Sequence, residues 1–435
     1  MIKLIETFDN ISTGQSFNLL DYYGSPYTVG SDVTLLEELG WIVVRGNLPH
    51  IDAGVGRMGT AAYGCTYGAA LATPSIGRKG TRLIMGVSVM LPVSNAGWGG
   101  NAANTIGLEV YFRYGEHVNF RITCRYNPAT NSVTVSMMTG ATGVGYPAIT
   151  IAEPVIPTPY ATQDYTFFEF SVDVTDYHNG RARVAVNGKT YVDKSGIVTA
   201  AYNVFGDNPY DDRATLDNVY FGPLPKETAY SVTWAESGYH FDTIYLCDDS
   251  GGYQDDFLGP IFSKTFYPVA AGSKSNWIPY VNSMQFEDGM HFARVDDDPV
   301  VPGNELEYLE ADQDLADESF VFPLDAVPPG SALISVNHRT MFRNVASQGT
   351  PPPHTLVPLY QIAGNPAVIT NSLAKKLTGW SYGFMDVYYN TVPGLAIPWT
   401  EFLLEQSEFG FLMREETWMG LGAEELAFAD EVIDE

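Results

Sequence analysis

The chain has 435 residues, a mass of 47.7 kDa and 45% hydrophobic residues, which excludes a single small domain and a globally disordered chain. It carries 51 acidic and 23 basic side chains, so its formal charge is −28. A field of that sign repels phosphate groups, and we therefore expect neither nucleic acid nor an anionic membrane among its partners.

The cysteines are few and widely spaced. Cys65, Cys124 and Cys247 form neither a CxxC motif nor a zinc-binding spacing. We interpret them as reduced, buried thiols, which indicates synthesis in a reducing cytosol. The first residues lack the basic-then-apolar layout of a signal peptide, and the sequence contains no apolar run long enough to cross a bilayer. We expect no secretory leader and no membrane-spanning segment.

Alternation of apolar and polar residues dominates the chain up to residue 258, and this period of two predicts strands with one buried face. In 120–125 one face carries Phe120, Ile122 and Cys124. The opposite face carries Arg121, Thr123 and Arg125. The same alternation occurs in 81–92, 133–137 and 167–173, and shorter strands are expected at 215–221 and 243–247.

The dipeptide Asn187-Gly188 stands between two alternating runs. It predicts a type I′ hairpin, because both central residues of that turn need a positive φ. Strands and turns at this spacing, with almost no helical periodicity, predict an antiparallel sandwich.

The composition of the sequence changes after Leu258-Gly259-Pro260. Residues 284–318 carry twelve acids and one base, which we interpret as solvated loops. New alternating runs at 334–342 and 409–413 predict a second, smaller sandwich. Thr400 precedes a short helical stretch, 400–405, and is the expected cap of that helix.

The last residues, 416–435, form an acidic C-terminal arm that contains no base. One interpretation is a frayed, solvated tail. The other is a docking arm that orders on a partner, and its large apolar side chains favour this hypothesis. We predict that the arm packs on another chain of a homo-oligomer or multi-copy assembly.

No standard catalytic motif occurs: the sequence lacks a P-loop, GxGxxG, HExxH and GxSxG, and its seven histidines are scattered. A sandwich glycosidase would need two carboxylates on one strand. Glu169 and Asp173 have that placement, but we interpret them as a solvated face. The sequence therefore predicts no catalytic residue, no cofactor and no enzymatic activity.

Four carboxylates surround a Gly-Gly turn, and oxygen ligands on a flexible loop suit Ca²⁺. They are Asp248, Asp249, Asp255 and Asp256. The stretch lacks the order of an EF-hand loop, so an acidic surface turn is the favoured interpretation and a metal site is not predicted.

Aromatic side chains in glycine-rich loops and in the arm are the candidate contacts for subunits or sugars. They are Trp98, Trp380, Tyr382, Trp418 and Phe428. For Trp98 the alternatives are subunit packing, glycan binding and a plain loop.

One stretch goes beyond pattern: Asp242-Thr243-Ile244-Tyr245-Leu246-Cys247-Asp248, followed by Asp255-Asp256-Phe257-Leu258-Gly259-Pro260. It resembles a segment of tailed-bacteriophage virion proteins that closes a concanavalin-A-like jelly roll and opens a second β unit. Phe8-Asp9 and Val184-Ala185-Val186-Asn187-Gly188 resemble two further elements of that family. Ala271 departs from the family's usual Asp.

The resemblance implies an all-β chain: a concanavalin-A-like jelly-roll domain over 1–258, a second, smaller β-sandwich over 259–415, and the arm. It implies a virion structural protein, assembled in the host cytoplasm with other virion proteins. Within the particle we expect a tail tip, baseplate or fibre component. The alternatives are a capsid decoration or head-fibre protein, and a lectin-like module for host surface glycans. The family carries no catalytic residues to transfer.

Overall fold

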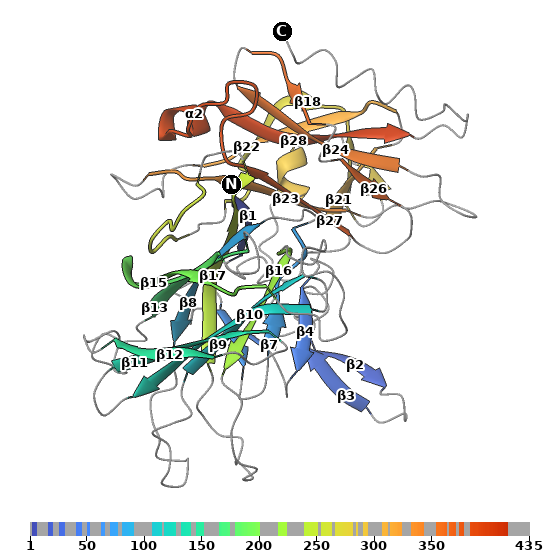
Figure 1. Cartoon of the computed structure of the whole chain (residues 1–435). Coiled ribbons are helices and arrows are strands. Elements are labelled where there is room, and N and C mark those ends of the chain that lie inside the picture. Colours follow the sequence, from blue (N-terminus) through green and yellow to red (C-terminus); the bar gives the residue numbers. More distant parts are fainter. Residues whose placement is uncertain are drawn as a thin grey trace, which may run out of the picture.

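The computed structural model describes residues 2–6, 16–20, 26–30, 41–45, 50–52, 62–65, 70–76, 81–90, 107–114, 117–127, 132–140, 145–151, 165–174, 179–200, 216–223, 239–250, 254–262, 266–281, 284–285, 290–294, 307–311, 314–323, 332–342, 354–362, 365–370, 374–377 and 383–415. About 67% of the structure is strand, and the strand pairs are antiparallel, as the sequence predicts. Figure 1 shows the strands up to β17 in one body and the later strands in a second.

The first body contains an eight-stranded sheet. Its order is β15-β14-β13-β8-β17-β6-β5, and β1 also pairs with β17. The strands are β15 (Lys189–Ile197), β14 (Gly180–Val186), β13 (Thr166–Asp173), β8 (Arg82–Met90), β17 (Tyr239–Asp248), β6 (Ala62–Cys65), β5 (His50–Asp52) and β1 (Ile2–Glu6).

A seven-stranded sheet lies against the first, in the order β12-β11-β10-β9-β16-β7-β4. Its strands are β12 (Gly145–Ile151), β11 (Ser132–Thr139), β10 (His117–Asn127), β9 (Gly107–Tyr114), β16 (Asn218–Pro223), β7 (Ala70–Ala72) and β4 (Ile42–Arg45). A separate hairpin pairs β2 (Ser16–Leu20) with β3 (Pro26–Gly30).

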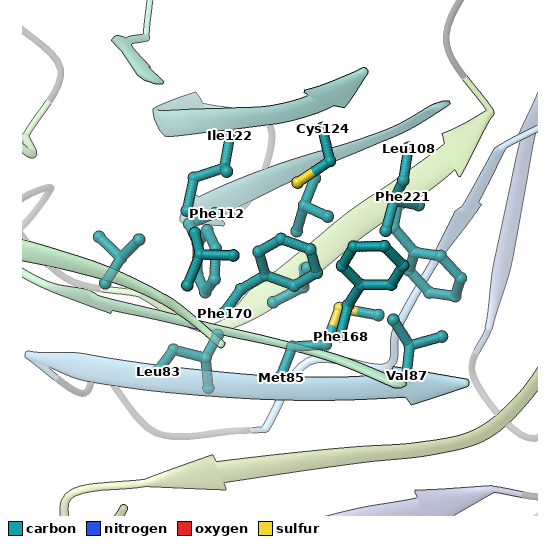
Figure 2. Packing of buried hydrophobic residues seen from close by; sticks show 14 of the residues in the cluster. Leu83, Met85, Val87, Leu108, Phe112, Ile122, Cys124, Phe168, Phe170 and Phe221 are labelled. Carbon is teal, nitrogen blue, oxygen red and sulfur yellow. The ribbon is translucent and has the colours of Figure 1, made fainter. Parts of the chain in front are cut away.

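The two sheets bury one hydrophobic cluster between them, and this makes the first body a β-sandwich. Figure 2 shows Met85, Phe168 and Phe170 of the eight-stranded sheet pointing toward Phe112 and Ile122 of the seven-stranded sheet. Four of them, Met85, Ile122, Phe168 and Phe170, are apolar positions of the predicted alternating runs. The predicted hairpin is also confirmed: Asn187 has a φ of 49° and Gly188 a φ of 79°.

The second body is built on a sheet in the order β18-β22-β28-β24-β25, with β26 also paired to β24. Its strands are β18 (Ala270–Ser275), β22 (Asp317–Val321), β28 (Ser407–Glu415), β24 (His354–Ile362), β25 (Val368–Ile369) and β26 (Lys375–Leu377). The pair β23 (Val336–Phe342) and β27 (Gly383–Tyr389) shares a hydrophobic cluster with this sheet, so the second unit also has two β layers.

Short elements complete the second body. A three-stranded sheet has the order β20 (Met284–Gln285), β19 (Ile278–Val281), β21 (Glu307–Glu310), and a 3-10 helix, η4, spans His291–Arg294. The helix α2 spans Glu401–Glu405, and the Thr400 side chain accepts a 3.2 Å hydrogen bond from the Leu403 backbone N–H. The predicted cap is therefore confirmed. Among the described residues, no helix is long and apolar enough to cross a membrane.

The acidic stretch 284–318 is not solvated throughout. Glu318, on β22, is fully buried, and its Oε1 lies 3.0 Å from Nδ1 of His291. The expectation of solvated loops is wrong at this position, because β22 is an interior strand of its sheet. The division of the chain at residues 258 and 415 stays a prediction.

Segment 254–262 covers part of the outer face of the eight-stranded sheet. Its Gly259 N–H donates a 2.8 Å hydrogen bond to Glu169 on β13, and Phe257 and Leu258 pack on the buried Tyr245 of β17. Glu169 is therefore buried, and Asp173, which forms an ion pair with Arg82, is buried as well. The interpretation of these two carboxylates as a solvated face is wrong, since a later segment of the chain returns over Glu169 and Asp173 is paired within its own sheet.

Candidate functional site

The five aromatic candidates from the sequence, Trp98, Trp380, Tyr382, Trp418 and Phe428, lie outside the described residues. So does the acidic arm, 416–435.

The four candidate calcium ligands are described, and three of their carboxylates have different protein partners. Asp248 accepts hydrogen bonds from Ser250 and lies 3.4 Å from Lys3 Nζ. Asp249 accepts a 2.7 Å bond from Thr81 Oγ1. The Asp255 carbonyl accepts a bond from Arg82, and Asp256 forms a 2.6 Å ion pair with Arg183. Within the described residues, no group of three or more potential metal ligands converges.

The outer face of the seven-stranded sheet gathers polar side chains from neighbouring strands. The strand register places Tyr111 of β9 directly between Tyr220 of β16 and Arg121 of β10. The next row on this face places Glu109 beside Thr123. We call the outward side chains of three strands the β9–β11 face: Glu109, Tyr111, Arg113, Arg121, Thr123, Arg125, Thr134, Ser136 and Met138.

Exposure changes across this outer face. At β7 and β16 it is covered, since Ala70, Ala72 and Tyr220 are buried in a small cluster of their own. At β9, β10 and β11 most outward side chains are half-buried, including Tyr111 and Arg121. The β9–β11 face is thus reachable by a ligand and bordered on one side by a covered region.

The centre of the β9–β11 face is a connected set of three side chains. The Tyr111 hydroxyl donates a 2.8 Å hydrogen bond to Glu109 Oε2. Burial and the Glu109 charge raise the pKa of Tyr111 to about 12, although Arg121 acts in the opposite direction. Tyr111 is therefore a protonated phenol at neutral pH. The Arg121 guanidinium lies 5.8 Å from the centre of the Tyr111 ring, within the range of a cation–π contact.

Aromatic packing fixes the tyrosine ring. Tyr111 and Tyr220 meet edge to face, with centroids 5.0 Å apart and an interplanar angle of 88°. This geometry is a favourable one for aromatic pairs. Tyr220 is in turn held on the covered side of the sheet, so the half-buried Tyr111 ring has a defined position before any ligand arrives.

At one edge of the β9–β11 face, polar atoms are left unsatisfied. Arg113 Nε is buried and has no hydrogen-bond partner among the described residues, and the same holds for Oδ1 of the adjacent Asn218. Buried polar groups normally have partners, and those without one often mark a place for a ligand or water. The arrangement offers guanidinium donors, a phenol and hydroxyl groups, which suit a polar, hydroxyl-rich ligand.

Alternation in the sequence predicts Arg121, Thr123 and Arg125 on one strand face, but it does not predict this site. Glu109 and Tyr111 alternate in the same way within 107–114, and that signal was available. What the sequence lacks is the register that brings Tyr111, Arg121 and Tyr220 into one row.

No protein-family model matches the chain, and no curated protein matches it in sequence. The solved structures that resemble it include a glucuronan lyase from Trichoderma reesei (11% identity, TM-score 0.33, 48% of this chain and 90% of that one). Alginate lyase Aly36B has 14% identity and a TM-score of 0.32, over 55% and 98% of the two chains. The CBM2 module of an evolved Dit from Lactobacillus casei BL23 phage J-1 has 10% identity and a TM-score of 0.29, over 54% and 96%. Identities this low concern the fold alone.

The prediction that this chain is not an enzyme is contradicted by this comparison, because the similar structures include polysaccharide lyases. The prediction depended on the absence of a paired-carboxylate motif. That motif belongs to hydrolases, and its absence does not address other ways of cleaving a polysaccharide.

Proposed function

We propose that this protein is a bacteriophage virion component whose first β-sandwich binds a glycan through the β9–β11 face. The observation that carries the glycan-binding part is the row Tyr220–Tyr111–Arg121, which holds a half-buried tyrosine beside a guanidinium. An aromatic ring offers an apolar face to a sugar ring, and neighbouring hydrogen-bonding groups fix its orientation. Thr123, Thr134 and Ser136 supply further hydroxyl groups on the same face.

The experiment is a binding screen of the whole chain against polysaccharides extracted from bacterial cell surfaces, followed by a Tyr111→Ala variant. We expect the variant to lose at least tenfold in affinity, because buried aromatic anchors carry much of the binding energy of a site. Tyr191→Ala is the matched control, since Tyr191 is a partly buried tyrosine on β15 of the other sheet. Binding that survives in Tyr111→Ala, or is lost equally in Tyr191→Ala, would reject this face as the site.

The place in the particle is the finer part of the proposal. We propose a tail-associated component, a tip, baseplate or fibre, present in several copies and assembled in the host cytoplasm. Its support is the resemblance of 242–260 to tailed-phage virion proteins. The test is to separate purified particles into heads and tails and to probe each fraction with an antibody against this chain. Signal in the head fraction alone would favour the capsid decoration or head fibre, and absence from both would reject a virion role.

A further inference from the structure

The described arginines of this acidic protein differ in whether they pair with a carboxylate. Four of them form ion pairs with aspartates: Arg82 with Asp173, Arg181 with Asp193, Arg183 with Asp256 and Arg339 with Asp386. Arg113 and Arg121 form no such pair with any described residue, and both lie on the β9–β11 face. Arg414 on β28 of the second body also forms no ion pair with a described residue, so Arg113 and Arg121 stand out because they share one face of one sheet.

The register places these two arginines close together. Arg113 is two residues beyond Tyr111 on β9, and Arg121 pairs directly with Tyr111 on β10. Same-face neighbours along a strand and across a diagonal are about 7 Å apart. One ligand of a few sugar units can therefore contact both guanidinium groups. The acidic group nearest to them on this face, Glu109, already accepts the Tyr111 proton donor.

We propose that the β9–β11 face selects an anionic glycan, one that bears carboxylate or sulfate groups, and that Arg113 and Arg121 bind those groups. The inference rests on the proposed glycan-binding function and adds the class of ligand. Guanidinium groups present paired N–H donors that match the two oxygens of a carboxylate or sulfate. Arg113 is half-buried on this face, and its Nε has no hydrogen-bond partner among the described residues.

The charge of the whole chain does not exclude such a ligand. A formal charge of −28 repels anions at long range, but salt screens charges beyond about 8 Å under physiological conditions. Within that distance, the positive charges of the two arginines contribute most to the potential that a bound anion meets. The long-range repulsion does disfavour a dense polyphosphate such as nucleic acid, because many phosphates would lie outside the reach of these two side chains.

A protein partner fits this face less well. The centre of a protein interface is normally apolar, whereas the half-buried side chains here are almost all polar, with Met138 as the apolar member. Hydroxyl groups and guanidinium groups along neighbouring strands suit a sugar chain better than a hydrophobic protein surface.

The test measures binding of the full chain to three probes: polygalacturonate, dextran sulfate and uncharged dextran. We expect binding to one or both charged probes, weaker at high salt, and little to dextran. Arg113→Gln and Arg121→Gln should each weaken it at least tenfold, since hydrogen bonds to charged groups are strong. Arg181→Gln is the control, because it removes an equal charge from the other sheet. Arg121→Lys, which keeps the charge on a half-buried strand position, should retain part of the affinity if the fold is intact.

Several outcomes would overturn the inference. Equal binding of dextran, unaffected by the arginine variants but lost in Tyr111→Ala, would leave glycan binding standing and reject the anionic class. Equal loss in Arg181→Gln would show a general charge effect. Displacement of the glycan by single-stranded DNA of the same charge would show an unselective polyanion site. A change of oligomeric state in Arg121→Gln would assign the face to contacts between copies of this chain. If no glycan binds at all, the proposed function fails as well.

Discussion

The hydroxyl of Tyr245 on β17 donates a 2.5 Å hydrogen bond to Glu169 Oε1 on β13, two strands away, and the same hydroxyl accepts a 3.2 Å bond from the Leu258 backbone N–H. Glu169 also accepts from the Gly259 N–H. A buried carboxylate is costly unless hydrogen bonds replace its water. This pair therefore fixes segment 254–262, which leads to the second body, onto the outer face of the eight-stranded sheet.

The first prediction concerns Tyr245→Phe. The variant keeps the ring but removes one donor to Glu169 and the acceptor of the Leu258 N–H. We expect a loss of about 1–3 kcal/mol in the free energy of unfolding, because buried polar groups are left unsatisfied. Urea titration of both proteins measures it. A loss below about 0.5 kcal/mol would show that the two hydrogen bonds contribute little to this attachment.

The second prediction concerns Gly86 on β8, which the Tyr245 ring covers. A Cβ added at Gly86 would lie 2.1 Å from Cε1 of that ring. The ring cannot move without breaking its hydrogen bonds, so we expect Gly86→Ala to cost about 3 kcal/mol or more, the upper range for overpacking. Gly145→Ala is the control, because an added Cβ there meets no atom within 4 Å. Equal melting temperatures of the two variants would contradict the argument.

Strand periodicity predicts the strands of the eight-stranded sheet, but it does not predict that segment 254–262 covers part of their outer face. The run 167–173 identified β13, and Asn187-Gly188 identified the turn between β14 and β15. Glu169 was nevertheless expected in solvent, because alternation assigns polar residues to the outer face of a sheet. Only the return of residues 254–262 to that face buries Glu169, and this contact joins positions 90 residues apart in sequence. Phe167 lies on the same face as Glu169, and an aromatic residue at that position indicates that the face is covered.

For the candidate site, too, the sequence predicts which residues share a strand face but not which residues of other strands lie beside them. The sequence assigned Arg121, Thr123 and Arg125 to one face of a strand, which the structure confirms. The neighbours of Arg121 depend on the register of β9, β10 and β16, and Tyr220 is 99 residues further along the chain than Arg121. Register is set by packing of the whole sheet rather than by local residues, so the row could not be read from the alternation.

The third prediction separates two contacts of Arg183 on β14. Its guanidinium forms a 2.6 Å ion pair with Asp256 and lies 4.5 Å from the centre of the Phe257 ring. The Arg183 side chain is nearly buried, but that of Asp256 is 66% exposed, and an ion pair screened by water at one partner contributes about 1 kcal/mol or less. Phe257 adds apolar burial and a cation–π contact to the same segment. We expect Phe257→Ala to destabilise the protein by about 1–3 kcal/mol and Asp256→Ala by less than about 1 kcal/mol.

Limited proteolysis gives a second measurement for these variants, since a loosened 254–262 segment is cleaved faster. The order of sensitivity should be Phe257→Ala above Asp256→Ala, with the latter near the wild type. The reverse order would show that the ion pair, rather than the ring, holds the segment on the sheet.

The last prediction concerns pH and the buried Glu318 of β22. Burial raises the pKa of Glu318 to about 8, although the Trp277 and Asn276 backbone N–H groups act to lower it. Its Oε1 lies 3.0 Å from His291 Nδ1, so below that pH the protonated acid stands within hydrogen-bond distance of the ring.

In the unfolded chain the same carboxyl group has a pKa of about 4.3. Below about pH 4 both states of Glu318 are protonated, and its contribution to stability is fully present. Between about pH 4.3 and 8 the unfolded chain releases the proton while the native protein keeps it, so stability falls as pH rises. Relative to Glu318→Gln, which cannot ionise and can still donate to His291, the wild type should lose about 2–5 kcal/mol across this range. Urea unfolding of both proteins at several pH values measures the difference, and Glu401→Gln, at an exposed position on α2, serves as the control. A difference between wild type and Glu318→Gln that stays constant with pH would show that Glu318 is ionised in the native protein and paired with a charged His291.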